Sequence, residues 1–280
     1  MTRRIDAHVH LWNRVTDPQE WIDPVSMAPI DRDFGSTDLE AMLASTHMEA
    51  AVLVQAGNSL EESARLAHSD PRLVAGLVAW VDLHKDIGAQ LARIRDGATV
   101  PVVGVRHLVH MDPDPRWLLL PGVSRGLEEL ARHGLTFDLV VRDWQLQQAA
   151  KVITAHPDLT FVLDHLGGPL AEDAELDRWE SGLRAVAAND NVVVKLSGLA
   201  SGMDAGQWVP EDLRDVVSTT VDVFGTHRLL YGSDWPLVEL GGGAPTWLAA
   251  VQELLAGLSD HERSAVFGGA ATVAYDLGLG

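Results

Sequence analysis

The stretch that decides the fold is Ile5-Asp6-Ala7-His8-Val9-His10-Leu11, which is typical of a short β-strand near the start of the chain. Seven further apolar runs follow it, at residues 51–55, 74–81, 102–109, 135–141, 160–166, 192–196 and 229–232. Amphipathic stretches separate most of these runs. Because strands rich in Val, Ile and Leu that alternate with helices pair in parallel, the eight runs predict an α/β fold of the (β/α)8 TIM-barrel type.

A doubly wound open sheet is the alternative architecture. Such a fold places a glycine-rich phosphate loop after its first strand when it binds dinucleotides, whereas this chain has histidines at those positions. The 280 residues fit one barrel of about 250 residues with insertions. We therefore predict a single domain that spans residues 1–280.

Capping residues and glycines mark the expected helix boundaries. Segments 37–40, 59–62 and 259–262 match the capping box, in which Ser or Thr begins a helix and an acidic residue three positions later bonds back to it. Gly134 and Gly225 are predicted to end helices in the left-handed conformation. The helix that begins at Ser259 is expected to close part of the barrel.

The composition excludes several classes of protein. Lysine and arginine total 21 against 40 acidic residues, and the net charge of −19 argues against nucleic acid and anionic membranes as partners. The chain has no cysteine, so disulfides and thiolate chemistry are ruled out. We expect a soluble, cytoplasmic enzyme that acts on a small molecule, because no leader-like or membrane-spanning apolar segment stands out. A homo-oligomer is compatible with this composition.

Two histidines in the first strand are the first candidates for chemistry. His8 and His10 are two positions apart, so both side chains point to the same face, at the strand end where barrels place their active sites. Imidazole nitrogens suit zinc and similar ions, and the pair could bind one ion together. The alternative is a pair of hydrogen-bonded core histidines.

Further candidates end the sixth and eighth runs. His165 precedes a glycine turn and is a third candidate ligand. Asp164 has the opposite parity and is expected to point toward the helix layer, where it would cap a loop. Asp234 should lie near His8, because barrel closure brings the last strand beside the first. Its carboxylate could act as a general base and then a general acid, or it could be an N-cap.

Other polar and aromatic side chains are candidates for binding substrate. The planar guanidinium of Arg106 could bind an anion or a carbonyl of the substrate with two hydrogen bonds. His107, of opposite parity, could contact substrate, pack outward or pin a loop. Lys195 could bind a substrate oxygen or tune the catalytic acid, or it could pair with a neighbouring carboxylate. The aromatic residues near strand ends could wall the pocket or simply pack, and these are Trp12, Trp144 and Trp235.

Five motifs in order carry a family resemblance: Asp6-Ala7-His8-Val9-His10-Leu11-Trp12, Gly104-Val105-Arg106-His107, Leu163-Asp164-His165-Leu166-Gly167, Lys195-Leu196-Ser197-Gly198 and Gly232-Ser233-Asp234-Trp235-Pro236. From Ile5 to about Tyr275 the chain resembles the amidohydrolase superfamily. Within it the chain is similar to the amidohydrolase-2 group, which contains sugar lactonases and pyrone-dicarboxylate lactonases. The resemblance implies that His8, His10, His165 and Asp234 line the site and that Asp234 activates the hydrolytic water.

The sequence departs from the superfamily pattern at several positions. The fourth strand has Arg106 rather than a bridging lysine, and the fifth has no histidine, so a two-metal centre is not expected. The resemblance implies at most one divalent ion, with zinc the leading candidate, and leaves open whether the reaction requires it. His110 stands where relatives often have glutamine, and we expect it to contact the substrate. Ala270 replaces a frequent asparagine, which we interpret as a lost cap.

These observations favour hydrolysis of a lactone, and a sugar-acid lactone in particular. Asp234 would take the proton from water, positioned by the three histidines directly or through an ion, while Arg106 holds the substrate. A metal-dependent decarboxylase of the same superfamily is the second hypothesis, and the missing fifth-strand histidine counts against it. The third hypothesis is a barrel that binds a sugar-like ligand without turnover.

Overall fold

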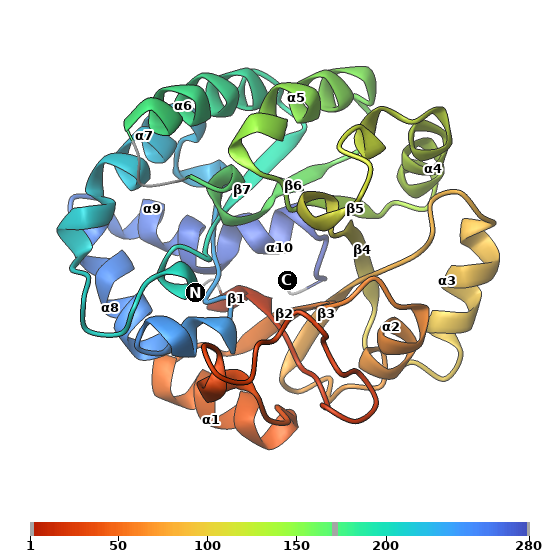
Figure 1. The fold of residues 1–280 in the computed structure, drawn as a ribbon, viewed down its shortest axis with the longest axis horizontal. Coiled ribbons are helices and arrows are strands. Elements are labelled where there is room, and N and C mark those ends of the chain that lie inside the picture. The colour runs from red at the N-terminus through yellow and green to blue at the C-terminus, as the bar shows by residue number, and fades with distance from the viewer. Residues whose placement is uncertain (1–2, 170–172, 279–280) are drawn as a thin grey trace.

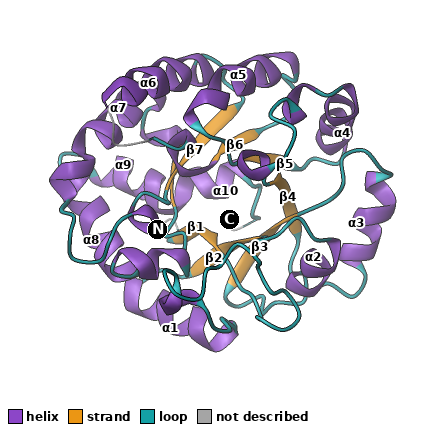
Figure 2. Cartoon of the chain, in the orientation of Figure 1, coloured by secondary structure: helices purple, strands orange, loops and turns teal. Residues whose placement is uncertain are grey.

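Eight parallel strands form one sheet in chain order, and helices surround it (Figure 1, Figure 2). The structure is a computed structural model that describes residues 3–169 and 173–278. The strands are β1 (Ile5–Val9), β2 (Ala50–Val54), β3 (Val74–Ala79), β4 (Val102–His107), β5 (Thr136–Leu139), β6 (Phe161–Leu163), β7 (Val192–Leu196) and β8 (Leu229–Tyr231). This arrangement confirms the predicted (β/α)8 barrel and excludes the doubly wound sheet.

The barrel closes where the segment after β8 runs beside β1. Val9 forms a parallel bridge with Trp235. The amide of Asp234 donates to the carbonyl oxygen of His8 at 2.9 Å, and the amide of His10 donates to that of Trp235 at 2.7 Å. The closure therefore places Asp234 between the two histidines of the first strand.

Helices alternate with the strands and form the outer ring in Figure 1. They are α1 (Ser36–Thr46), α2 (Leu60–Leu66), α3 (Ile87–Arg95), α4 (Pro121–Arg132), α5 (Leu146–Ala155), α6 (Asp173–Ala187), α7 (Arg214–Phe224), α8 (Ala244–Leu254), α9 (Asp260–Ser264) and α10 (Ala270–Ala274). In α4, for example, Val123, Leu127 and Leu130 are buried at helical spacing, so one face of the helix packs on the barrel. Across the described part of the chain, no helix combines the length and apolar character needed to span a bilayer.

The predicted helix starts are confirmed in part. Ser259 accepts a bond from the amide of Glu262, whose carboxylate accepts from the amide of Ser259, so the third capping box is complete. Ser59 also caps its helix. The capping box at Thr37 is wrong, because α1 begins at Ser36 and its N-cap is Gly35, two residues before Thr37, with the amide of Gly35 bonded to Asp38.

The predicted left-handed helix ends differ from each other. Gly134 has a φ of +67° after α4, as expected. Gly225 also has a positive φ, but its ψ of 164° lies outside the left-handed helical region. This glycine therefore ends α7 in a more extended conformation than the sequence pattern predicts.

The last helices lie across one end of the barrel. In Figure 1, α10 appears inside the ring of strands. Ala271 and Tyr275 pack in one apolar cluster with Val52, Val54 and Leu230 of the strands. This cluster closes the end of the barrel opposite the histidine-rich strand ends, in agreement with the appendage expected after Ser259.

Candidate active site

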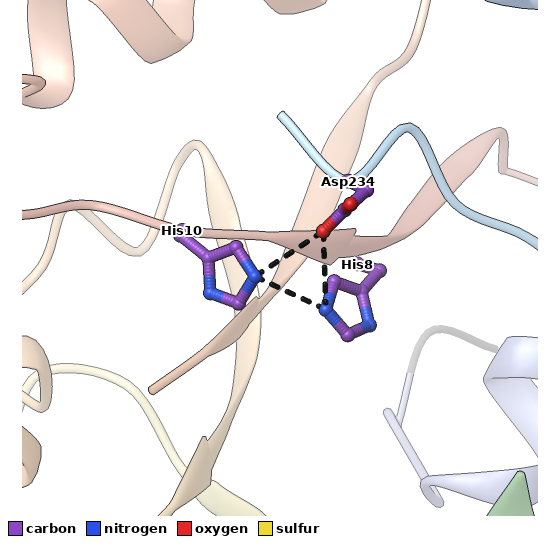
Figure 3. A group of neighbouring side chains, drawn as sticks. All are labelled: His8, His10 and Asp234. Carbon is purple, nitrogen blue, oxygen red and sulfur yellow. Dashed lines mark hydrogen bonds and ion pairs between the residues drawn. The ribbon is translucent and has the colours of Figure 1, made fainter. Parts of the chain in front are cut away.

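His8, His10 and Asp234 converge at the strand ends of the barrel (Figure 3). The Nε2 atoms of the two histidines are 3.1 Å apart. Oδ1 of Asp234 lies 3.4 Å from Nε2 of His10 and 3.7 Å from Nε2 of His8. The extended backbone continues from β1 through His10, whose amide bonds to Trp235, and the two-residue spacing and the barrel closure together place the three side chains where the sequence predicts them.

The surroundings of His10 define its tautomer. Its Nδ1 lies 2.8 Å from the carbonyl oxygen of Val54, which can only accept, so Nδ1 carries the proton. The lone pair of Nε2 is consequently directed at His8 and Asp234. A histidine that donates its other N–H to a backbone carbonyl is the usual arrangement for a metal ligand.

Asp234 is held in an unusual backbone conformation. Its φ is +61°, which is uncommon for a residue with a side chain and is found at functional sites. Ser201, in the turn Ala200–Gly202 after β7, donates its hydroxyl to Oδ2 of Asp234 at 2.8 Å. Oδ1 is buried and forms no hydrogen bond with any described residue. No sequence motif pointed to Ser201, because it lies in a loop whose path follows no residue periodicity.

His165 reaches the same site from the turn after β6. The strand ends at Leu163, and His165 follows with a φ of +52° in the turn Asp164–Gly167. Its ring lies 4.6 Å from that of His8, and its Nδ1 lies 2.9 Å from Oγ of Ser197. Gly198 has a φ of +75°, and a Cβ there would lie 2.4 Å from Nδ1 of His165. Only glycine leaves room for this histidine.

The prediction for Asp164 is wrong, because its side chain faces the interior of the barrel. Oδ2 accepts from Nη1 of Arg106 at 2.9 Å, and Oδ1 lies 2.9 Å from Nζ of Lys195 and 3.4 Å from Nδ1 of His8. The parity argument failed because the chain turns directly after Leu163, with His165 and Leu166 at positive φ, so the alternation of β6 does not continue to Asp164. Asp164 and His165 therefore both face the site.

Arg106 is enclosed by protein acceptors. Its Nε and Nη2 donate to Oε1 of Gln55, and Nη2 also donates to the carbonyl oxygen of Gln55. Nη1 donates to Asp164 and lies 3.2 Å from Nε2 of His8. Every nitrogen of the guanidinium thus has a partner within the protein. Gln55, at the end of β2, is a second residue of the site that sequence patterns did not reveal.

Lys195 is fully buried among three polar atoms. Nζ donates to Oδ2 of Asp138 at 2.6 Å, and it lies 2.9 Å from Oδ1 of Asp164 and 3.1 Å from Nδ1 of His8. Of the roles considered from the sequence, these contacts correspond to the pairing with carboxylates. The ammonium links two acidic residues to the first histidine.

The remaining candidates lie around this centre. His107 stacks on Trp117 at 3.8 Å, accepts from Nε1 of Trp80 at 3.2 Å and has its Nε2 2.8 Å from Oδ2 of Asp112, so it pins the loop after β4. Nδ1 of His110 is buried and has no hydrogen-bond partner among residues 3–169 and 173–278. Trp235 is buried and packs edge to face on Phe34, 5.2 Å away.

The aromatic residues outside this centre differ in exposure. Trp12 is buried and bonds through Nε1 to the carbonyl oxygen of Arg32. Trp144 is 46% exposed, so it presents an open aromatic face to solvent.

Burial and neighbouring charges shift the pKa values of the central groups. Burial lowers the pKa of His8 well below its usual value, and the charge of Lys195 lowers it further. Burial also lowers the pKa of His10, although Asp234 opposes the shift. For Asp234, burial alone would raise the pKa, but His165, His10 and His8 together hold it below its usual value. At neutral pH His8 and His10 are therefore neutral and lie beside the ionised carboxylate of Asp234.

The donor set fits one divalent cation. Nε2 of His8, Nε2 of His10 and Oδ1 of Asp234 point at one another, and Oδ1 forms no hydrogen bond with described residues. Two neutral nitrogens with one carboxylate are ligands that zinc prefers. Nη1 of Arg106 also lies near Nε2 of His8. It donates to Asp164 as well, so it would keep an acceptor if an ion bound to Nε2 of His8. The carboxylate of Asp164 is already paired with Arg106 and Lys195, which makes it a poorer metal ligand than that of Asp234.

Comparisons with known proteins cover the whole chain. A family model described as Amidohydrolase matches residues 5–277. The chain is 33% identical over 288 residues to the L-fucono-1,5-lactonase of Burkholderia ambifaria, covering 99% of this chain and 97% of that protein. It is 32% identical over 288 residues to that of Burkholderia multivorans, covering 98% and 96%. A crystal structure of a B. multivorans amidohydrolase with bound zinc superimposes with a TM-score of 0.89 at 30% identity, covering 98% and 99%.

Proposed function

Because this chain belongs to the amidohydrolase family, we propose that it hydrolyses the ring ester of a sugar-acid lactone, with L-fucono-1,5-lactone as the first substrate to test. The observation that carries the proposal is the convergence of Asp234 with His8 and His10, on a chain that matches L-fucono-1,5-lactonases over nearly its full length. An ionised carboxylate beside neutral imidazoles is suited to moving a proton between water and a leaving oxygen.

In the proposed reaction, Asp234 accepts a proton from water while the water oxygen bonds to the lactone carbonyl carbon. The ring C–O bond then breaks, and the proton on Asp234 passes to the departing ring oxygen, which becomes the hydroxyl of the open acid. Ser201 holds the carboxylate by its hydrogen bond to Oδ2. Because His8, His10 and Asp234 are at most 3% exposed, their electrostatic interactions act with little screening from water.

A divalent ion, with zinc as first choice, would be held by His8, His10 and Asp234, with His165 as a further candidate ligand. When bound, it would supply positive charge beside the reacting carbonyl. His10 is prepared for this role by its bond to Val54, and Ser197 orients His165.

Contacts to substrate are assigned to side chains with free donor or acceptor atoms. His110 offers a nitrogen that no described residue occupies, and we assign it to a substrate oxygen. Arg106 and Lys195 have protein partners at every side-chain nitrogen. We therefore assign them to orienting His8 and Asp164 rather than to binding the substrate directly. His107 would act on substrate only through the loop that it pins, and Trp235 would form part of the wall.

The test is titration of the acid released from a panel of aldonolactones by wild-type protein and Asp234→Asn. We expect the wild type to open at least one sugar-acid lactone and the variant to lose about a thousandfold or more in kcat, since a positioned acid–base group contributes roughly 10² to 10⁴. Asp260→Asn, at a side chain that is 98% exposed, is the matched control and should keep full activity. A wild type that opens no lactone, or an Asp234→Asn variant with full activity, would refute the proposal.

A further inference from the structure

Tyr275 connects the closed end of the barrel to the acidic residue Asp138. It follows α10, is 2% exposed and donates its hydroxyl to Oδ2 of Asp138 at 2.6 Å. The two residues are 137 positions apart in the chain. A buried hydroxyl that donates to a buried carboxylate forms one of the stronger hydrogen bonds in proteins.

Asp138 depends on a small number of donors. It is fully buried on β5, where Thr136 donates to Oδ1 at 3.2 Å, and Lys195 and Tyr275 share Oδ2 at 2.6 Å each. Burial raises the pKa of Asp138, and the bonds from Lys195 and Tyr275 oppose this shift. The Tyr275 hydroxyl therefore helps to maintain the charged carboxylate that pairs with Lys195.

Lys195 carries the connection onward to the first histidine. Its Nζ contacts Asp138, Asp164 and Nδ1 of His8, so the position of the ammonium depends on the attraction of all three neighbours. Nε2 of His8 in turn lies 3.7 Å from Oδ1 of Asp234. An unbroken series of buried contacts thus runs from the last helix to the acid–base residue.

We propose that Tyr275 is a positioning residue for the hydrolytic site and that it sets the orientation of His8 through Asp138 and Lys195. The inference rests on the proposed lactone hydrolysis for its kinetic consequence, while its structural consequence is independent of the substrate. Tyr275 touches neither substrate nor reacting atoms.

The physical reason is that removing one donor from Asp138 shifts the balance at Lys195. Without the Tyr275 hydroxyl, the carboxylate is less well satisfied and draws the ammonium more strongly, which lengthens the contact to His8. Side chains that support a reactive group control its geometry, and small displacements at the reacting centre reduce the rate of chemistry more than the affinity for substrate.

Tyr275→Phe tests this inference because it keeps the ring that lies 5.5 Å from Nζ of Lys195 and removes only the hydroxyl. We expect kcat to fall about tenfold with KM unchanged. Tyr231→Phe is the matched control, since Tyr231 is also fully buried but its hydroxyl bonds to no described residue. This control should retain wild-type kcat.

Two further measurements separate positioning from a general loss of stability. In an Asp138→Asn background, Tyr275→Phe should reduce kcat by less than about twofold, because the link is already broken. A crystal structure of Tyr275→Phe should show a longer distance from Nζ of Lys195 to Nδ1 of His8 in an otherwise unchanged barrel. Either a kcat close to that of the wild type or an unmoved Lys195 and His8 would overturn the inference. A wild type inactive on all lactones would refute the proposed function alone, and the crystal structure would still decide the positioning role.

Discussion

Asp234 is the residue on which the other groups of the site converge. Its backbone is in the left-handed region, its Oδ2 is bonded to Ser201, and its Oδ1 faces two histidines. A strained backbone conformation at such a residue is maintained by surrounding contacts, here the closure bonds to β1. The orientation of one carboxylate thus depends on residues from three separate segments of the chain.

We predict that Ser201→Ala lowers kcat/KM for the lactone by roughly 10- to 100-fold. The variant lacks the hydroxyl that donates to Asp234, and a hydrogen bond to a charged group contributes roughly 1.5–3 kcal/mol. Steady-state kinetics measures the effect. Ser218→Ala is the control, because Ser218 is exposed and its hydroxyl donates to the backbone of Asp215 in the same helix. Equal kinetics for the two variants would show that the bond to Asp234 is unimportant for catalysis.

At this scale, predictions from strand alternation are correct where the backbone stays extended and wrong where it turns. His8 and His10 could be placed because a strand alternates strictly, and their shared face is observed. Asp164 was misplaced because the chain turns directly after β6, whereas the backbone after β1 stays paired with the neighbouring segment through His10. Ser201 and Gln55 could not be identified, because their contacts join segments far apart in the chain and follow no periodicity.

At the scale of elements, α2 holds the turn that carries Gln55. Glu62, in the first turn of α2, accepts from the amides of Ala56 and Gly57 at 2.7 and 2.9 Å. Gln55 precedes this turn and holds Arg106. A helix that makes no direct contact with the reacting groups thereby fixes the end of β2. The sequence pattern predicts the helix start at Ser59, but the carboxylate of Glu62, expected to bond back to Ser59, holds this turn instead.

Glu62 also makes the stability of this element depend on pH. Burial raises the pKa of Glu62 from 4.5 to about 7, with a smaller contribution from Asp17, while the bonds from Ala56 and Gly57 and the charge of Arg65 oppose it. Because the folded pKa lies above the unfolded one, the folded protein binds more protons between these pH values. This contribution to stability is complete below about pH 4.5 and is lost as the pH rises through about 7.

We predict that Glu62→Gln removes this dependence. Between about pH 5 and pH 8, the wild type should lose about 2 kcal/mol more free energy of unfolding than the variant. The reason is that only the wild type has a buried carboxyl group that ionises in this range. Urea denaturation at the two pH values measures the difference. Glu128→Gln, on α4, serves as the control. Parallel pH profiles for wild type and Glu62→Gln would contradict the prediction.

At the scale of the whole molecule, the barrel brings together residues from nearly every strand end. The fold could be predicted because eight apolar runs separated by helices have few compact arrangements, and the family resemblance agreed with the pattern. The pairing of Asp138 with Lys195 and Tyr275 could not be predicted, because it depends on the barrel register and on the path of the last helix.

We predict that zinc raises the melting temperature of the protein. A ligand that binds only the folded state at about 100 times its Kd contributes about 2.7 kcal/mol, which for a chain of this size corresponds to roughly 5 °C. Calorimetry before and after chelation, with metal content by mass spectrometry, measures the effect. In His10→Ala the zinc-dependent shift should disappear. A wild type that neither retains zinc nor responds to it would show that the site does not hold the ion.

The bond that closes the barrel also has a consequence for synthesis of the chain. Asp6 accepts from the amide of Ser233, 227 positions later. At about 5 to 20 residues per second, a ribosome needs roughly 10 to 45 seconds to make that interval. During this time one edge of β1 has no strand beside it, and His8 and His10 have not yet met Asp234. A nascent chain in that state exposes an unpaired strand edge, which is the kind of surface that chaperones protect.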